Sequence, residues 1–316
     1  MFQYIIRRLL IAIPVLLGVT IFNFLIINLA PGNPVDMYIN PDTTQADIDA
    51  KKEALGLNDP IFIQYFRWLG NLLQGDFGFS YTTYEPVLDL VLNRVGPTLL
   101  LMSTALIIAY IIAIPIGILS ATKQYSWIDY LTTTFSFLGV SIPNFFLGLG
   151  SIYVFALVLN ILPTGGMFTL GSNGGFMDTF FHLIMPAAIL GTGIAGSTVR
   201  YVRSSMLEVL GQDYLRTARA KGLREFIVTN KHGLKNALIP IITIIGMEIP
   251  VLIGGAVVTE QIFQWPGLGQ LTIQSISSRD YPTLMAINFI AALAVLFSNL
   301  LTDILYAVVD PRIKYN

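Results

Sequence analysis

The sequence predicts an all-α integral membrane protein with six transmembrane helices. Of its 316 residues, 54% are hydrophobic and only 12% are charged, and its mean hydropathy is +0.69. Soluble domains carry about 25% charged residues, so this low density is typical of a protein that sits in lipid. The chain also contains six apolar stretches, each long enough to supply the roughly 20 residues with which a helix crosses a bilayer.

The six expected spans follow one another along the chain. They cover residues 9–30, 98–122, 130–160, 179–199, 237–259 and 281–302. The first is too long for the core of a secretory signal peptide, which runs to about 15 residues, so we expect a retained anchor. The third is expected to end near Asn160, because the uncharged sequence that follows is rich in turn residues.

The distribution of basic residues predicts the orientation of these spans. If the N-terminus is cytoplasmic, thirteen of the 18 Lys and Arg residues lie on the cytoplasmic side, eight of them between Arg200 and Lys235. The opposite side keeps Lys51, Lys52, Arg67, Arg94 and Arg279. Because cytoplasmic loops carry an excess of Lys and Arg, we expect both termini in the cytoplasm.

We expect three regions: residues 1–30 with the first transmembrane helix, an extracytoplasmic segment at 31–96, and a core at 97–316 with five helices and a cytoplasmic loop at 200–236. In the outer segment, "TTQADIDAKKEALG" predicts a helix with a Thr cap that ends at Gly56. The stretch "IFIQYFRWLGNLLQ" is aromatic and amphipathic, and we expect it at the membrane interface or against neighbouring spans. The whole segment is either an ordered lid over helix ends or a docking or gating surface.

Several kinds of chemistry are not indicated in this chain. It has no cysteine and only two histidines, His182 and His232, so a thiolate or His-based metal site is not expected. It has no G-x-x-x-x-G-K-[ST] phosphate loop, and no Ser, His and Asp set has plausible spacing, which leaves an intramembrane hydrolase as a weak alternative. We therefore expect a non-catalytic chain with no cofactor or metal of its own and no nucleic-acid partner. Any ATP that drives it must be hydrolysed in another chain.

The most basic stretch, "DYLRTARAKG" at residues 213–222, predicts a short cytoplasmic helix. Asp213 is expected to cap this helix, and Gly222 to end it after about two turns. Leu215, Ala218 and Gly222 then form a narrow stripe of mostly small residues. Small residues permit close approach by another surface, so the helix could fit a groove on a partner. The alternative is a basic loop that only meets anionic lipid headgroups.

One acidic residue and two amides inside the expected spans are candidates for a translocation pathway. Glu248 is near the middle of the fifth span, where an isolated charge is costly. It is either a group that lines the pathway or a protonated or paired residue between helices. Asn144, beside Pro143 in the third span, and Asn288 in the sixth are weaker candidates, because an intramembrane Asn more often forms hydrogen bonds between helices.

The outer end of the fifth span carries the sequence "GGAVVTEQIFQWPGLG". Trp265, Pro266 and Gly267 predict a rigid turn with an aromatic anchor. This turn could form part of an outer gate, or it could only seat a re-entrant segment.

The basic stretch also carries a family resemblance. "DYLRTARAKG", followed by "LKNALIP", resembles the cytoplasmic EAA loop of bacterial ABC importer permeases. Arg216, Thr217 and Ala218 occupy the Glu-Ala-Ala positions, a departure that is similar to the peptide and nickel branch of the family. Further segments agree along nearly the whole chain: "YIIRRLL", "APGNP", "GLNDP", "GDFGFS", "GGAVVTEQIFQWPGLGQL", "RDYPTLMA" and "VDPRI".

The resemblance implies a type I ABC importer permease fold in the bacterial cytoplasmic membrane, with residues 97–316 as the permease core. It also implies a heterodimer with a second related permease, two ATP-binding subunits that use ATP and Mg, an extracytoplasmic peptide-binding protein and a peptide substrate. In such transporters the loop helix docks on an ATPase subunit. By position in the motif, this ATPase-coupling role falls to Tyr214, Arg216, Ala218, Arg219 and Gly222.

We therefore expect the permease subunit of an ATP-driven oligopeptide importer, coupled through residues 213–222. Dipeptide import and nickel or metal-chelate import are alternatives within the family, and nickel is less favoured because no His, Cys or acidic cluster lines the expected spans. A secondary transporter or channel would need several paired ionisable residues in the membrane, whereas Glu248 stands almost alone. A membrane scaffold without transport is opposed mainly by the resemblance.

Overall fold

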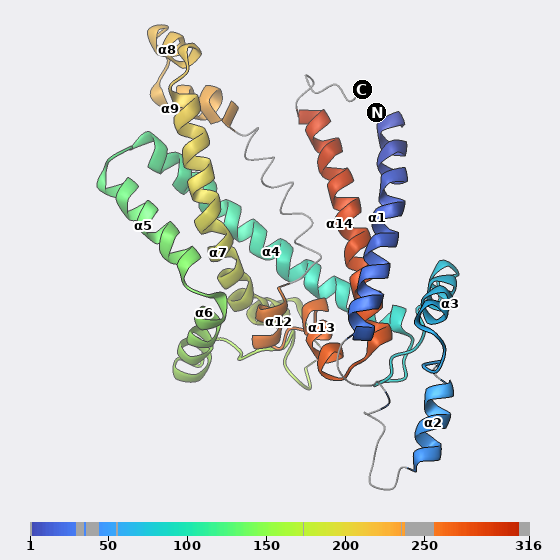
Figure 1. Cartoon of the computed structure of the whole chain (residues 1–316). Helices are drawn as coiled ribbons and strands as arrows, with labels where there is room; N and C mark the ends of the chain where they lie inside the picture. Colours follow the sequence, from blue (N-terminus) through green and yellow to red (C-terminus); the bar gives the residue numbers. More distant parts are fainter. Residues whose placement is uncertain are drawn as a thin grey trace.

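The computed structural model describes residues 2–29, 35, 44–54, 56–172, 174–234, 236–237 and 256–309, and the regular structure in these ranges is helical (Figure 1). Among these residues, four helices are long and apolar enough to cross a membrane. They are α1 (Phe2–Leu29), α4 (Val87–Thr122), α7 (Phe176–Leu210) and α14 (Tyr281–Val309). They contain the expected first, second, fourth and sixth spans, apart from Ala30, which lies outside the described residues.

The expected third span is broken rather than continuous. α5 (Trp127–Ser141) is followed by α6 (Asn144–Ser151) and the π-helical η2 (Ile152–Val158), and the two halves meet at an angle of 92°. Pro143 explains the break, because proline lacks a backbone N–H and disfavours helical backbone at the preceding residue. Ile142 is accordingly extended, with ψ 121°.

The expected fifth span lies mostly outside the described residues, and so does its Glu248. The described chain continues with α12 (Val257–Ile262) and α13 (Leu268–Ser277). In Figure 1 the start of α1 and the end of α14 lie at the same end of the helix assembly as α8 (Asp213–Ala220), whereas α12 and α13 lie at the opposite end. We refer to these two ends as the α8 end and the α13 end.

Two short helices precede α4 at the α13 end. α2 (Gln45–Ala54) is capped by Thr44, as predicted: Thr44 Oγ1 accepts from the Asp47 N–H at 3.3 Å, and the Thr44 N–H donates to the Asp47 carboxylate at 3.0 Å. Gly56 follows with φ +68°. α3 (Ile61–Leu73) is the expected amphipathic helix, and it packs against α1 and the start of α14.

The contact between α4 and α7 is the most extensive one between helices in the described residues. A Cβ on Gly191 would lie 2.9 Å from the Ala105 carbonyl oxygen, and one on Gly117 would lie 2.6 Å from the Val202 side chain. Between these two points Ala109, Ala113, Ala195 and Val199 form one buried cluster. Lipid tails are as apolar as these helix faces, so close packing of small residues, rather than the hydrophobic effect, stabilises the pair.

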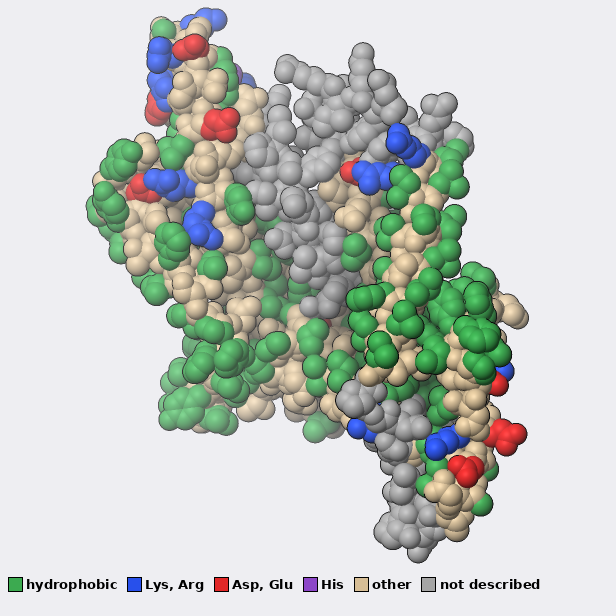
Figure 2. All heavy atoms as spheres, in the orientation of Figure 1, with side chains coloured by type: hydrophobic (Ala, Val, Ile, Leu, Met, Phe, Trp, Pro, Cys, Tyr) green, Lys and Arg blue, Asp and Glu red, His purple; other side chains and the backbone are tan. Residues whose placement is uncertain are grey.

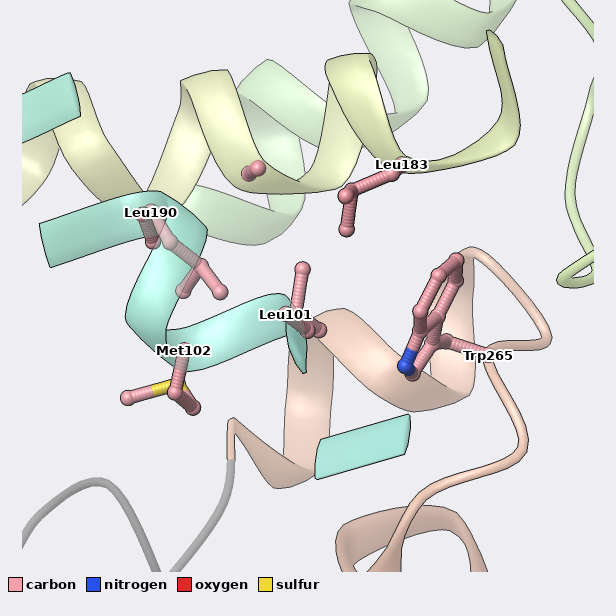
Figure 3. Close-up of a cluster of buried hydrophobic side chains, with 7 residues drawn as sticks. Leu101, Met102, Leu183, Leu190 and Trp265 are labelled. Carbon is pink, nitrogen blue, oxygen red and sulfur yellow. The ribbon is translucent and has the colours of Figure 1, made fainter. Parts of the chain in front are cut away.

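The core continues from α4 and α7 to the turn between α12 and α13. Figure 3 shows Trp265 of this turn in one cluster with side chains of both long helices: Leu101, Met102, Leu183 and Leu190. Trp265 and Leu101 are fully buried. The α12–α13 turn is therefore fixed on both α4 and α7.

A cluster of charged and polar side chains, which we call the charged clamp, joins α4, α5 and α7. It lies toward the α8 end of the contact between α4 and α7. Arg203 donates two hydrogen bonds to Asp129, from Nε at 2.7 Å and from Nη2 at 2.8 Å. The same carboxylate accepts from the Ser120 hydroxyl and from the Tyr125 N–H. Asp129 is only 3% exposed, so its charge depends on these partners rather than on water.

We expect Arg203→Met to lower the free energy of unfolding by about 3 kcal/mol, because it leaves the buried Asp129 carboxylate without its counter-charge. Denaturant titration of the purified chain in detergent would measure the loss. The double variant Asp129→Asn/Arg203→Met should regain part of it.

Arg200→Met is the matched control, since Arg200 is exposed on the same helix, with its guanidinium carbon 5.0 Å from the centre of the Phe137 ring. This variant should lose no more than about 1 kcal/mol. Equal losses in the two single variants would contradict the clamp.

Candidate functional site

The predicted loop helix is present as α8, directly after α7. Its cap is Gln212 rather than Asp213, and the Gln212 side chain makes no cap hydrogen bond. Asp213 instead lies in the first turn, where its Oδ1 is 3.6 Å from Nη1 of Arg216. Gly222 has φ +76°, a left-handed backbone that favours glycine and ends the helix as expected.

Two of the three residues of the predicted stripe, Leu215 and Ala218, face inward, whereas Gly222 is exposed. Leu215 and Ala218 are buried against Val228, beside the last turn of α7. Their cover is the returning segment, made of α9 (Glu225–Ile227) and the π-helical η3 (Val228–Gly233). The chain's own returning segment thus covers the part of the stripe formed by Leu215 and Ala218, and a partner contact at Gly222 stays a prediction.

The outward face of α8 and its surroundings is basic and aromatic. Tyr214 is 42% exposed and Phe226 is 77% exposed, and Figure 2 shows Lys and Arg side chains gathered at this end. The exposed cations of the motif are Arg216, Arg219 and Lys221. Asn236 Nδ2 donates to the Tyr214 hydroxyl at 2.9 Å, which fixes the phenol oxygen against the chain that follows η3.

Arg219 has a partner across the turn that follows α8. Its Nη2 lies 2.9 Å from the Glu225 carboxylate, so the pair bridges α8 and α9. Because the guanidinium donates hydrogen bonds to it, the pKa of the Glu225 carboxyl lies below its usual value, and the pKa of Arg219 is raised. Arg216, by contrast, is 82% exposed.

At the α13 end the structure shows a buried acid that the sequence reasoning missed. Glu260 of α12 is fully buried. Its Oε1 accepts from the Thr98 hydroxyl at 2.9 Å, and its Oε2 accepts from the N–H groups of Gly269 and Gln270 at 2.7 and 3.1 Å. Thr98 Oγ1 in turn accepts from the Leu268 N–H at 2.8 Å.

These contacts cap α13 from outside its own sequence. The first N–H groups of a helix have no partner within the helix and need acceptors elsewhere. The residue before α13 is Gly267, which has no side chain to supply one, and a Cβ there would lie 2.3 Å from the Glu260 carboxylate. The sequence did carry a signal for this role. Gly267 precedes a helix that it cannot cap, and Glu260 is an isolated acid shortly before it.

The outer-gate candidates lie together in the turn that Glu260 supports. Trp265 is fully buried, and its indole N–H donates to the Pro97 carbonyl at 2.9 Å. Gly267 is also buried, whereas Pro266 is half-buried and lines an open cavity of about 560 Å³ with Gly165 and Gln264. Both roles expected for the turn, part of an outer gate or the seat of a re-entrant segment, stay predictions.

The two pathway candidates that the structure describes, Asn144 and Asn288, are not brought together. Asn144 is the first residue of α6, exposed at the break after Pro143, and its side chain lies beside Gly193 of α7. Asn288 is half-buried in α14, on the other side of the helix assembly in Figure 1. Glu248 lies outside the described residues.

A cavity of about 540 Å³, lined by both polar and apolar side chains, opens at the α13 end. Its lining includes Ser80, Thr82, Thr83, Arg94, Gln261 and Gln274. Within the described part of the chain, the buried Gln261 Oε1 has no hydrogen-bond partner. The Asp280 carboxylate lines the same cavity, but it already accepts hydrogen bonds from within the chain. Its donors are the hydroxyls of Ser80 and Thr283, at 2.5 and 2.7 Å. The lining thus includes amide, hydroxyl and guanidinium side chains, and Arg94 already donates through Nη1 to Gln270 Oε1 at 3.1 Å.

The described residues contain no group of three or more His, Cys, Asp or Glu side chains that could hold a metal ion. His182 is buried and lies 2.9 Å, through Nδ1, from the Gly165 carbonyl oxygen. Its environment is that of a structural histidine rather than a ligand.

Two family descriptions match the chain. Residues 113–315 match the family described as "Binding-protein-dependent transport system inner membrane component". Residues 1–102 match the N-terminal family described as "Binding-prot-dependent transport system membrane comp, N-term". Together they confirm the family resemblance carried by the sequence motifs.

Named relatives align over the whole chain. It is 52% identical over 316 residues to the oligopeptide transport system permease protein AppB of Bacillus subtilis, with 100% of each chain covered. It is 46% identical over 317 residues to a putative peptide permease of Brucella suis, with 99% of each covered. It is 39% identical over 315 residues to the glutathione transport system permease protein GsiC of Escherichia coli K12, with 100% of each covered.

A solved structure shares the fold. A chain of the MetNI methionine ABC transporter, in an inward-facing conformation, is similar with a TM-score of 0.56 and 18% identity. The match covers 72% of this chain and 99% of the other. At this identity the likeness concerns the fold alone.

We expect Glu260→Met to destabilise the chain by about 3 kcal/mol or more, because it leaves the amides of Gly269 and Gln270 and the Thr98 hydroxyl without their acceptor. Hydrogen–deuterium exchange should show faster exchange in the first turn of α13. Glu260→Gln keeps one acceptor oxygen and should show a smaller change.

Gln274→Met is the matched control, since Gln274 is exposed later in the same helix. It should leave the exchange of the first turn unchanged. If the amides in the first turn of α13 exchange at the same rate in Glu260→Met and Gln274→Met, Glu260 does not cap α13.

Proposed function

Since the chain belongs to the family of binding-protein-dependent transport system inner membrane components, we propose that it is the permease subunit of an ATP-driven importer of oligopeptides. The observation that carries this substrate is the 52% identity, over both full lengths, to an oligopeptide permease of Bacillus subtilis. The relatives at 46% and 39% identity are named for a peptide and for glutathione, which is itself a short peptide.

The cavity at the α13 end, which has both polar and apolar side chains in its wall, suits a peptide substrate. A peptide presents amide N–H and C=O groups along its length, and these need hydrogen-bond partners wherever water is excluded. The walls of the cavity carry hydroxyl and amide side chains together with Arg94. Arg94 donates one of its N–H groups to Gln270 Oε1 at 3.1 Å, and its remaining N–H groups suit a carboxylate.

The proposed complex contains a second related permease, two ATP-binding subunits that hold ATP and Mg, and an extracytoplasmic peptide-binding protein. In it, the α8 end faces the cytoplasm, which agrees with the excess of Lys and Arg there. The outward face of α8, with Tyr214 and Arg216, docks on an ATPase subunit. Tyr and Arg are enriched among the residues that dominate the binding energy of interfaces.

Dipeptide, glutathione and nickel or metal-chelate import are the alternatives. The full-length relative named for glutathione transport favours a short peptide as the nearest competitor. Nickel is less favoured, because the described residues hold no cluster of metal-ligating side chains. A channel or secondary transporter does not fit a family defined by dependence on a binding protein.

We expect Arg216→Glu to weaken the association of the ATPase subunit about tenfold, because it reverses an exposed charge in the proposed interface. Peptide-stimulated ATP hydrolysis should fall with it, while the chain still inserts in the membrane. Co-purification and ATPase assays in proteoliposomes would measure both effects.

Lys123→Glu supplies the control for this charge reversal. Lys123 is exposed in the turn between α4 and α5, outside α8 and its returning segment. Normal coupling in Arg216→Glu, or equal loss in both variants, would count against docking through the outward face of α8.

The substrate can be tested in proteoliposomes that contain the complete complex and its binding protein. An oligopeptide should stimulate ATP hydrolysis and accumulate inside vesicles loaded with ATP, whereas glutathione and nickel should do neither. If ATP hydrolysis is stimulated only by glutathione, or only by nickel, that compound and not an oligopeptide is the substrate. Accumulation without ATP would indicate a channel instead.

A further inference from the structure

α3 has three faces, and the chain itself occupies two of them. The first, formed by Tyr65, Trp68 and Leu72, packs toward α1 and α14. The second is polar and meets the loop that precedes the helix. There Gln64 donates to the Asp59 carbonyl at 2.8 Å, and Arg67 pairs with the Asp59 carboxylate at 2.7 Å.

The third face of α3 is apolar and exposed. It consists of Phe62, Phe66 and Leu73, which are 63%, 65% and 80% exposed. These residues are four and seven positions apart, so their side chains lie on one side of the helix. Removing such a side chain from water is worth about 1.5–3 kcal/mol. This face, which we call the outer stripe, is therefore unfavourable in contact with water.

Contacts with α1 fix the depth of α3. The hydroxyl oxygens of Thr20 and Tyr65 are 3.0 Å apart, and the rings of Phe24 and Tyr65 meet edge to face at 5.4 Å. Thr20 precedes Leu29, the last residue of α1, by nine positions, which is about 14 Å along a helix. The hydrocarbon of one leaflet is about 15 Å thick. Tyr65 thus contacts a part of α1 that lies among acyl chains.

The outer stripe continues an apolar surface of α1. At the same depth, Phe22, Leu25 and Ile26 are 65%, 44% and 50% exposed. Figure 2 shows hydrophobic side chains continuing from α1 across α3, with the charged residues of α2 beyond them. α1 is long and apolar enough to cross the membrane, so its exposed side faces lipid, and the surface beside it has the same surroundings.

We propose that α3 is embedded in the membrane and that the outer stripe contacts the acyl chains of the leaflet at the α13 end. The segment between α1 and α4 is then anchored in lipid through α3 rather than held only by the ends of the spans. Its polar face and the Arg67–Asp59 pair are directed toward the loop at residues 56–59, where the chain leaves the hydrocarbon. The proposal does not depend on which substrate is transported.

The absence of cysteine from the chain permits a direct test. Phe62→Cys and Phe66→Cys each create a single labelling site at an exposed position, so the core is not disturbed. The full-length chain, assembled with partners whose cysteines are replaced, carries a nitroxide label in nanodiscs of phosphatidylethanolamine and phosphatidylglycerol. Electron paramagnetic resonance then measures collisions with oxygen, which partitions into lipid, and with a water-soluble nickel chelate.

Reference labels define the two extremes. Phe22→Cys on α1 reports lipid, and Asp49→Cys, exposed on α2, reports water. We expect the ratio of oxygen to chelate collisions at both α3 sites to match that of Phe22→Cys and to be reversed from that of Asp49→Cys. Asn71→Cys, on the polar face of the same helix, should show a lower ratio than Phe66→Cys.

Two outcomes would overturn the proposal. Chelate collisions as frequent as at Asp49→Cys would put the outer stripe in water. An immobile label with few collisions of either kind would show that another protein covers it.

Discussion

The close approach of α4 and α7 is the constraint on which the other contacts depend. Gly191 and Gly117 leave no room for a side chain between the two helices, so the helices are held at a fixed spacing. Only at that spacing can Trp265 contact both Leu101 and Leu183. The clamp of Arg203 on Asp129 depends on it as well, since Ser120 of α4 donates to the same carboxylate.

The contact between α4 and α7 also connects the α8 end of the molecule with the α13 end. At one end, only two residues separate α7 from α8. At the other end, Thr98 of α4 holds the first turn of α13 and the carboxylate of Glu260. The packed pair of α7 and α4 therefore forms a continuous structural connection between α8 and the α12–α13 turn. In an ATP-driven importer, that connection links the ATPase side with the opposite mouth.

Sequence alone predicted the parts of this fold that lipid dictates. The spans in α1, α4, α7 and α14 were found because a bilayer demands long apolar helices, whatever their neighbours are. The start of α4 at Val87, eleven residues before the expected Thr98, was missed because the helix continues beyond its uncharged stretch, through Arg94. Pro143 was visible in the sequence, but the break that it causes was not predicted, because a hydropathy pattern carries no information about backbone geometry.

The candidate sites were harder to predict, because their partners are distant in sequence. Thr98 and Glu260 are 162 positions apart, and no local pattern pairs them. The motif at residues 213–222 correctly predicted a helix that ends at Gly222, and it correctly indicated the family. Periodicity identified the face that holds Leu215 and Ala218, but it could not say whether that face meets a partner or the chain itself.

The inward packing of α8 changes how a docking helix of this kind would work. A helix that used its small residues for docking would be loosely held before binding, and its ordering would oppose association. Here Leu215 and Ala218 already anchor α8 on Val228, and Arg219 ties it to Glu225 across the turn. The ordering is thus complete in the free chain. A rigid α8 also transmits a push from a partner to α7, whereas a loose one would absorb it.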